Sequence, residues 1–430
     1  MGNLCIKSDT NSRSKSSGSK CYNFKCTSDT PNAGVAGCWI NIESKHYKAI
    51  SNDLLKALAD TDVSFLNPVN NTSIDKTKIL QDFSDNKIGF KFFKTESAFE
   101  IEYESLQKLN SKFTTPNEKK TLETCTALYQ EQNVNGFIIT SDNKFTLTTT
   151  KMKTSKSSER EVTTNKAYVI MYKNCYYNLR EMLLKNKSKF NATKFLNDIR
   201  PFMKKLHSVD LEHLDLKLEN IVYCPNNGYR IIDFAFAITE TQKEFQMSLD
   251  YMLPHILFYK VYPRWAYQQD IRNAEDTNLF RIQQQVFNTI DTYIEENFKN
   301  LHNNAQECKR QIDLWPEKTD FSRWIFRKTD DYAIALILYK MCGPEITKET
   351  YFKELISAKP YFDDRPLVTT STLMPSDVNV TVAGSRRSKS RPSSYKKHRS
   401  IKINGKMTTI YIGARGKDCI KAKKLYIQLN

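Results

Sequence analysis

The hydrophobic and polar positions of this chain follow two rhythms, which separate predicted strands from predicted helices. Short apolar runs bounded by turn residues predict strands, and apolar residues three or four positions apart predict amphipathic helices. Together these elements predict an α+β fold. The predicted strands are residues 87–93, 167–172, 221–223 and 230–233, the last two joined as a hairpin by the Pro-Asn-Asn-Gly turn at 225–228. The predicted helices are residues 51–59, 96–109, 179–184, 194–207, 278–300 and 331–341.

Other stretches lack either rhythm and indicate how the chain is divided. Residues 1–32 are rich in Ser, Lys, Asn and Thr, which predicts a disordered segment, and residues 368–394 read as a Ser/Arg-rich linker. Residues 33–367 are then the globular part. Apolar residues alternate around Asn404-Gly405 within residues 395–430, which predicts a small β-hairpin module. Residues 67–86 read as a loop and residues 141–166 as a hairpin with a long loop.

The net charge of the 430-residue chain is +17, and most of it lies in the C-terminal tail. Residues 385–430 hold fourteen Lys and Arg against one acid, Asp418, so the other 384 residues carry only +4. A dense basic tail is typical of contact with an anionic partner such as nucleic acid, lipid or a virion component. A solvated tail with no partner is the alternative.

Cysteine and apolar content restrict the compartment. The ten cysteines form no CxxC pair, and Cys21 and Cys26 have no second His or Cys pair to complete a zinc site. We therefore expect reduced thiols. No run of apolar residues is long enough to span a bilayer, and the N-terminus has no signal-peptide core, so secretion is not expected.

The candidate chemistry lies between residues 213 and 235. Asp215 and Asn220 offer a carboxylate and an amide five residues apart, with Lys217 between them. Asp233 follows at the end of the predicted hairpin, which can return it to a place beside Asn220. Phosphoryl transfer needs these groups: a carboxylate to orient a hydroxyl, oxygen ligands for Mg²⁺ and a cation for the phosphates.

The segment His213-Leu-Asp215-Leu-Lys217-Leu-Glu-Asn220, followed by Asp233-Phe-Ala235, resembles the catalytic loop and the metal-binding motif of protein kinases. The resemblance covers about residues 33–365. It implies a bilobal fold, with a small antiparallel-sheet lobe at about 33–172, a helical lobe at about 173–367, and ATP in the cleft. It further implies that Asp215 is the catalytic base, that Lys217 steadies the transferred phosphate, and that Asn220 and Asp233 hold Mg²⁺.

The same resemblance implies the remaining parts of the nucleotide site. Lys91 takes the place of the lysine that holds the α- and β-phosphates, and Glu102 that of its helical partner, with Lys94 and Glu100 or Glu104 as competitors. Residues 170–172 look like the hinge, so Met171 and Tyr172 are expected to meet the adenine. Gly34 and Gly37 look like a remnant of the glycine-rich loop, and Asp330 resembles the aspartate that braces the catalytic loop.

Three departures from the family pattern matter. The glycine-rich loop is incomplete and lies far before Lys91. Leu214 replaces the arginine before the catalytic aspartate, so activation by a phosphorylated loop paired to that arginine is not expected. Ala235 replaces a glycine, and alanine resists positive φ, so it is expected to restrain a flip of the metal-binding motif.

Both ends of the chain add resemblances of their own. Residues 395–430 are similar to a short C-terminal module of nucleocytoplasmic large DNA viruses, with Lys417 where a glycine is usual. The catalytic segment also looks like the kinases of those viruses, which implies a location in the host cytoplasm or virion. A folding appendage is the alternative role for the module. Met1-Gly2 and Cys5 indicate lipidation and membrane contact, although Ile6 departs from the preferred Ser or Thr.

The leading hypothesis is therefore a serine/threonine protein kinase that uses ATP and Mg²⁺ and acts on protein substrates. Lys217, two residues after Asp215, is typical of the serine/threonine branch. One alternative is a pseudokinase that acts as a binding or scaffold protein, since Leu214, Ala235 and the glycine loop depart from the pattern. Another is a small-molecule phosphotransferase, although Phe234 after Asp233 favours the protein-kinase branch.

Overall fold

The structure is a computed structural model. It describes residues 21–28, 37–40, 48–93, 95–153, 156–224, 228–235, 249–260, 277–302, 304–313, 319–362, 398–403 and 406–411. The chain divides into two compact units, residues 1–369 and 370–430, and each is described by itself. The predicted lipidation sites Gly2 and Cys5, the glycine Gly34 and the linker at 368–394 lie outside the described residues.

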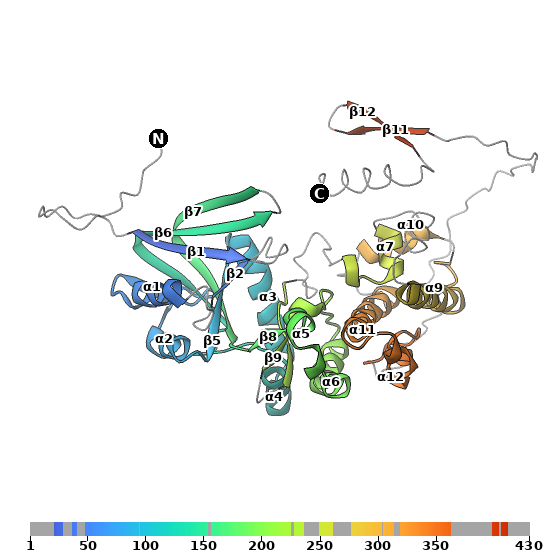
Figure 1. The fold of residues 1–430 in the computed structure, drawn as a ribbon, viewed down its shortest axis with the longest axis horizontal. Helices are drawn as coiled ribbons and strands as arrows, with labels where there is room; N and C mark the ends of the chain where they lie inside the picture. Colours follow the sequence, from blue (N-terminus) through green and yellow to red (C-terminus); the bar gives the residue numbers. More distant parts are fainter. Residues whose placement is uncertain are drawn as a thin grey trace, which may run out of the picture. The chain divides into compact units, whose positions relative to one another are not determined.

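The N-terminal part of the first unit is a seven-stranded sheet (Figure 1). Its order is β2-β5-β7-β6-β3-β4, and β1 pairs with β6 in parallel, whereas the other pairings are antiparallel. The strands are β1 (Cys21–Ser28), β2 (Gly37–Ile40), β3 (Val63–Leu66), β4 (Ser73–Ile74), β5 (Ile88–Phe93), β6 (Gly136–Lys153) and β7 (Lys156–Lys173).

The two faces of this sheet are covered by different helices. Successive strand residues point to opposite faces. On β5, Phe90 and Phe92 lie in a buried cluster with α1 and α2, whereas Phe93 packs on Phe99 of α3, with 5.6 Å between ring centroids. Lys91 therefore points to the α3 face. The helices of this part are α1 (Lys48–Ala59), α2 (Lys76–Ser84), α3 (Glu96–Lys112) and α4 (Pro116–Cys125).

The second part of this unit is mainly helical and is built around α11 (Figure 1). Helix α11 begins after the N-cap Thr319 and ends at Gly343, whose φ of 83° is left-handed, and almost all of it is buried. A small sheet, β8 (Tyr177–Asn178), β9 (Ile221–Cys224) and β10 (Gly228–Ile231), lies beside the catalytic segment. The helices are α5 (Leu179–Lys185), α6 (Ala192–Ser208), α7 (Pro254–Lys260), α9 (Thr277–Asn297), α10 (Ala305–Asp313), α11 (Asp320–Cys342) and α12 (Thr350–Leu355).

The predicted α+β class is confirmed, and each predicted helix is present. The last of them starts earlier than expected, at Asp320. Its first half was not predicted because charged side chains interrupt the apolar pattern there, although several of these side chains are buried. The loop predicted at residues 67–86 is wrong, since β4 and α2 lie there. Asp75 caps α2 by accepting a hydrogen bond from the Thr77 N–H at 2.9 Å, and Ile79 and Phe83 form its buried face.

Two further expectations about loops differ from the structure. Residues 21–28 form β1, within the segment expected to be disordered. Their apolar and polar residues alternate, which is the pattern of a strand. In the hairpin of residues 141–166 the strands β6 and β7 run much further than predicted. Their pairing extends to Lys153 and Lys156, so the long loop is instead paired strand.

The second unit contains the hairpin expected in the C-terminal module. Strand β11 (His398–Ile403) pairs with β12 (Lys406–Tyr411) in antiparallel fashion. Residues 412–430, the rest of the module, lie outside the described part. Among the helices that the structure describes in either unit, none combines the length and apolar character needed to cross a bilayer.

Candidate active site

A buried ion pair joins the sheet to α3. Lys91 on β5 is 2% exposed, and its Nζ lies 2.5 Å from Oε2 of Glu102, which is fully buried on α3. Removing two charges from water is costly, so such a pair persists only when each charge is compensated. The competing carboxylates of Glu100 and Glu104 are exposed, and Lys94 lies outside the described residues.

Lys91 also contacts a second carboxylate, from a segment much further along the chain. Its Nζ donates to Oδ1 of Asp233 at 3.0 Å, across 142 residues of sequence. Asp233 follows β10 with a φ of 67°, in the left-handed region that a non-glycine residue rarely adopts. Ala235, by contrast, is not among the positive-φ residues of the described chain, so the alanine itself adopts an ordinary backbone conformation.

One lysine thus serves two carboxylates, and burial decides how their pKa values separate. Burial raises the pKa of Glu102, and the nearby Asp233 charge adds to this, while Lys91 opposes it without prevailing. Asp233 has a side chain 24% exposed, and although burial would raise its pKa, Lys91, Lys217 and His213 outweigh this and lower it. The two carboxylates hold the pKa of Lys91 well above its usual value, against its burial. Lys91 therefore lies between two carboxylates whose pKa values shift in opposite directions.

The loop predicted to be catalytic, at His213–Asn220, is anchored to the central helix by Asp330. This fully buried side chain on α11 accepts from the backbone N–H groups of His213 and Leu214, at 2.8 Å each. Leu214 has a φ of 61°, so the residue before Asp215 is held in a left-handed conformation. His213 Nε2 lies 3.2 Å from the carbonyl oxygen of Ile232, which ties the loop to the residue before Asp233.

The loop brings three predicted side chains together. Lys217 Nζ lies 2.5 Å from Oδ2 of Asp215. Asn220 Nδ2 donates to the backbone oxygen of Asp215 at 2.8 Å and to its Oδ2 at 3.0 Å. Asp215 is 1% exposed and is therefore held in one orientation by a cation and an amide. The N–H of Ile232 donates to the backbone oxygen of Asn220 at 3.0 Å, which places Asn220 beside the segment of Asp233.

The donor set of this segment fits Mg²⁺. Because the Asn220 amide nitrogen faces Asp215, its oxygen is the atom left for coordination, and Asp233 supplies a charged, partly exposed carboxylate. Mg²⁺ usually takes one or two protein oxygens together with substrate phosphates and water. In the described part of the chain no three His, Cys, Asp or Glu side chains gather as ligands, so a site of protein ligands alone is not present there.

The predicted adenine contacts are placed differently. Met171 points to the sheet face opposite Lys91, in the cluster with α1 and α2. Its backbone N–H donates to the Asn135 oxygen at 2.8 Å and its carbonyl accepts from the Tyr129 N–H at 3.2 Å, so neither group is presented to a ligand. Tyr172 lies in the interior and donates to Oε1 of Glu102 at 2.5 Å. Both residues lie inside the paired part of β7, and the adenine contact expected of them stays a prediction.

The structure describes one of the two glycines predicted to contact the phosphates. Gly37 opens β2, which pairs with β5 so that Gly37 is opposite Phe93 and Trp39 is opposite Lys91. The strand that carries this glycine is therefore next to the strand that carries the lysine, although Gly37 precedes Lys91 by 54 positions in the sequence. Gly34 is outside the described residues, so the loop between the two glycines has no structural description.

A disulfide that the sequence did not predict lies next to the site. Cys175, in the segment after β7, is linked to Cys224 at the end of β9, with 4.4 Å between Cα atoms. The expectation of reduced thiols is wrong for this pair. Tyr177 pairs with Tyr223 across β8 and β9, and this contact, formed only on folding, brings the two cysteines together.

Another missed contact is at the edge of the catalytic loop. Arg180 of α5 forms an ion pair with Glu219, which lies between Lys217 and Asn220. The pair fastens α5 to the 3₁₀ turn at Leu218–Asn220. No spacing in the sequence signals it, because the partners are 39 residues apart.

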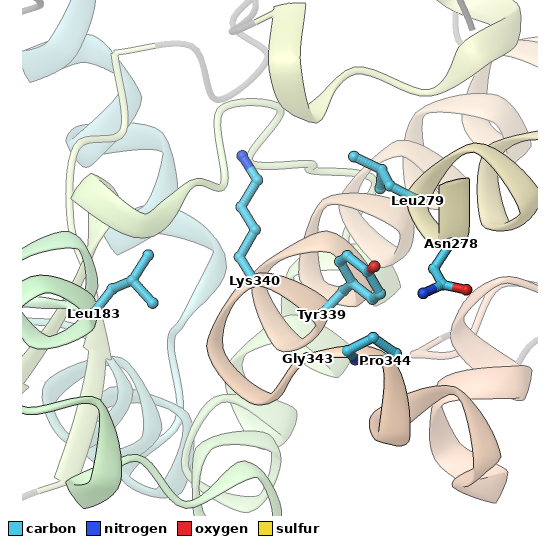
Figure 2. Close-up of a pocket in the computed structure, with 7 residues that line it drawn as sticks. All are labelled: Leu183, Asn278, Leu279, Tyr339, Lys340, Gly343 and Pro344. Carbon is cyan, nitrogen blue, oxygen red and sulfur yellow. The ribbon is translucent and has the colours of Figure 1, made fainter. Parts of the chain in front are cut away.

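A hollow of about 430 Å³ lies in the helical part, away from these residues. Figure 2 shows Leu183 of α5, Asn278 and Leu279 of α9, and the end of α11 around it. None of its lining residues belongs to the cluster of Lys91, Asp215 and Asp233, so we do not assign it to the nucleotide. Lys340, at its rim, lies with Nζ 4.1 Å above the ring of Tyr251.

Comparisons with known proteins give structural neighbours but no sequence relatives. No protein-family model matches the chain, and no curated protein matches it. The structure of the yeast RNA Pol II CTD kinase CTDK-1 complex is 14% identical, with a TM-score of 0.26, over 41% of this chain and 48% of that chain. This chain thus spans about half the length of that first neighbour.

Two other solved structures cover more. The ROP18 kinase domain in complex with AMP-PNP and sucrose is 12% identical, with a TM-score of 0.32, over 74% of this chain and 90% of that one. A Toxoplasma gondii specific rhoptry antigen kinase domain is 11% identical, with a TM-score of 0.33, over 67% and 73%. At these TM-scores the overlays carry no argument, so the class rests on topology and site.

Topology and site agree. A mainly antiparallel sheet carries Lys91, the next helix carries Glu102, and a loop anchored to a buried central helix carries Asp215. A hairpin then delivers Asp233 to Lys91. The described residues define a bilobal, protein-kinase-like protein.

Proposed function

We propose that the chain is a serine/threonine protein kinase of the type found in nucleocytoplasmic large DNA viruses. The observation that supports this best is the contact of Lys91 with both Glu102 and Asp233, which unites three distant segments at one point. The viral assignment rests on the sequence resemblance alone. The serine/threonine assignment rests on Lys217, two residues after Asp215.

Each side chain then has a chemical task. ATP, held with Mg²⁺, supplies the phosphoryl group. Lys91 is a cation fixed where phosphate oxygens would lie, and Asn220 and Asp233 would hold the metal. Asp215 orients the acceptor hydroxyl and takes its proton as the oxygen bonds to phosphorus and the bond to the ADP oxygen breaks. Lys217, already beside Asp215, offers a cation to the charge that moves between the two oxygens.

Transfer of labelled phosphate from ATP to casein-like acceptors tests the proposal. We expect Asp215→Asn and Asp233→Asn to lower kcat by at least about 100-fold, because general-base and charge-stabilising groups contribute on that scale. Lys91→Met should also abolish transfer. Asp62→Asn, which changes an exposed carboxylate, is the matched control and should leave the rate unchanged.

Other outcomes point elsewhere. Equal transfer by wild type and Asp233→Asn would falsify the metal assignment. Loss of transfer in Lys94→Met but not in Lys91→Met would move the phosphate contact to Lys94. Absence of transfer in the wild type, with ATP still bound, would favour a pseudokinase that acts as a scaffold.

A further inference from the structure

Tyr172 has a buried hydroxyl with hydrogen bonds to two residues of the candidate site. The side chain is 1% exposed and points from β7 toward α3. Its Oη donates to Oε1 of Glu102 at 2.5 Å. The same oxygen accepts a hydrogen bond from the backbone N–H of Asp233. Tyr172 therefore joins the helix that carries Glu102 to the segment that carries Asp233.

These contacts close a ring of four residues. Lys91 bridges Glu102 and Asp233 through their carboxylates, and Tyr172 bridges the same two residues through Oε1 and a backbone N–H. Both oxygens of Glu102 thus have a partner, one from each bridge. The carboxylate cannot turn toward either partner without releasing the other.

The second bridge acts on a residue whose backbone is left-handed. Asp233 is held at a φ of 67°, which an L-residue adopts only when its surroundings fix it. Lys91 fixes its side chain, and the hydroxyl of Tyr172 fixes its N–H. Without the hydroxyl, a buried N–H and a buried carboxylate oxygen would both lose a partner, and such unpaired groups are costly.

We infer that Tyr172 is a positioning residue of the phosphotransfer site, whose hydroxyl holds Glu102 and the backbone of Asp233 in register so that the Asp233 carboxylate is presented to the cation. This rests on the proposed function for its chemistry. It differs from the adenine contact that the sequence indicated. It assigns Tyr172 an effect on turnover and on cation use, with little effect on nucleotide affinity in the absence of the cation.

The test is Tyr172→Phe, which keeps the ring and removes only the hydroxyl. Tyr229→Phe is the control, because Tyr229 is also 1% exposed and its hydroxyl also accepts a backbone hydrogen bond, from the Asn191 N–H at 3.0 Å, whereas Tyr172→Phe loses the hydrogen bond to Glu102 as well. Two measurements are made on each full-length protein, below its Tm. The first is kcat and KM for ATP, and the second is binding of a fluorescent ATP analogue with and without Mg²⁺.

We expect Tyr172→Phe to lower kcat about tenfold or more, because two buried hydrogen bonds are lost and one alone corresponds to about that factor, with KM for ATP little changed. The Mg²⁺ concentration for half-maximal enhancement of analogue binding should rise several-fold. Tyr229→Phe should also lower Tm but leave kcat and the Mg²⁺ response within about twofold of wild type, since a hydrogen bond remote from the site is not part of the transition state.

The inference is overturned if Tyr172→Phe keeps both kcat and the Mg²⁺ response, or if the two variants lose activity in proportion to their loss of Tm. A wild type without transfer would overturn the proposed function but not this inference, because the Mg²⁺ response of analogue binding still compares the two variants. An unchanged Mg²⁺ response in Tyr172→Phe would overturn it in that case as well.

Discussion

Asp330 and Asp331 are consecutive on α11, and both are fully buried, yet their side chains hold different structures. Asp330 accepts from the N–H groups of His213 and Leu214 and thereby fixes the catalytic loop. Asp331 accepts from Lys328 Nζ at 2.9 Å and from the Tyr361 N–H at 2.7 Å. Burial raises the pKa of Asp331 and lowers that of Lys328, because removal from water disfavours the charged form of each side chain.

The two aspartates make a matched experiment. Asp330→Asn leaves a backbone N–H facing an amide group, which should lower the free energy of unfolding by about 1–3 kcal/mol. Asp331→Asn breaks a buried ion pair and should cost about 3–5 kcal/mol. We nevertheless expect kcat to fall only in Asp330→Asn. Denaturant unfolding and phosphate transfer measure both effects, and loss of kcat in Asp331→Asn alone would contradict the bracing role of Asp330.

At the scale of elements, α4 is fastened at its N-terminus by a single carboxylate. Glu118 accepts from the N–H groups of Thr114 and Thr115, at 3.0 Å each, in a capping box with Thr115. It also lies 2.5 Å from Lys205 of α6. The ion pair with Lys205, together with the backbone hydrogen bonds, lowers the pKa of Glu118 to about 2.

This carboxylate makes a pH-dependent contribution to stability. Because its folded pKa is lower than the ordinary glutamate value of 4.5, the contribution is complete above that value and is lost as the pH falls toward about 2. Glu118→Gln should therefore lower Tm at pH 7, and the difference from wild type should narrow as the pH falls through this window. Circular dichroism melts measure it. Glu100→Gln, on the exposed side of α3, is the control, and a difference independent of pH would contradict the assignment.

The same scale shows what a sequence can predict. Periodic elements such as α3 and α6 are readable because the apolar spacing that buries one face is local. Asp215 and Asp233 were readable from motif spacing, and Lys91 and Glu102 from the resemblance to protein kinases. The structure places Lys91 with Glu102 and Asp233, and Asp215 with Asn220. Tyr172 and the Arg180–Glu219 pair were not readable, because their roles depend on partners 70 and 39 residues away. Helix α2 was not predicted because most of its residues are polar. Its buried face is short, and the N-cap Asp75 supplies part of its stability.

At the scale of the whole first unit, the Cys175–Cys224 disulfide links the end of the sheet to the small sheet beside the catalytic loop. The separation of 49 residues encloses α5, α6 and residues 213–220. A cross-link of that span reduces the entropy of the unfolded chain, by loop-closure entropy worth about 4 kcal/mol.

Reduction should therefore lower stability. We expect Cys224→Ser to lower Tm without reductant, and dithiothreitol to bring the wild type down to the same value. Cys342→Ser, at an exposed free thiol, is the control and should change neither. Intact-mass measurement after alkylation reports whether the pair is oxidised. If the untreated wild type is oxidised and still melts at the same temperature with and without dithiothreitol, the prediction is contradicted.

The same cross-link has a consequence for limited proteolysis. Residues 176–223 form the part of a covalent ring that contains the catalytic loop, so a protease that cuts once there opens the ring but releases neither fragment. A nicked molecule would migrate as one band on a non-reducing gel and as two after reduction. The nick site could then be mapped while His213–Asn220 remains attached on both sides. ATP binding that persists in the nicked form would show that the disulfide holds the site together, and loss of binding would show that the site needs an unbroken chain.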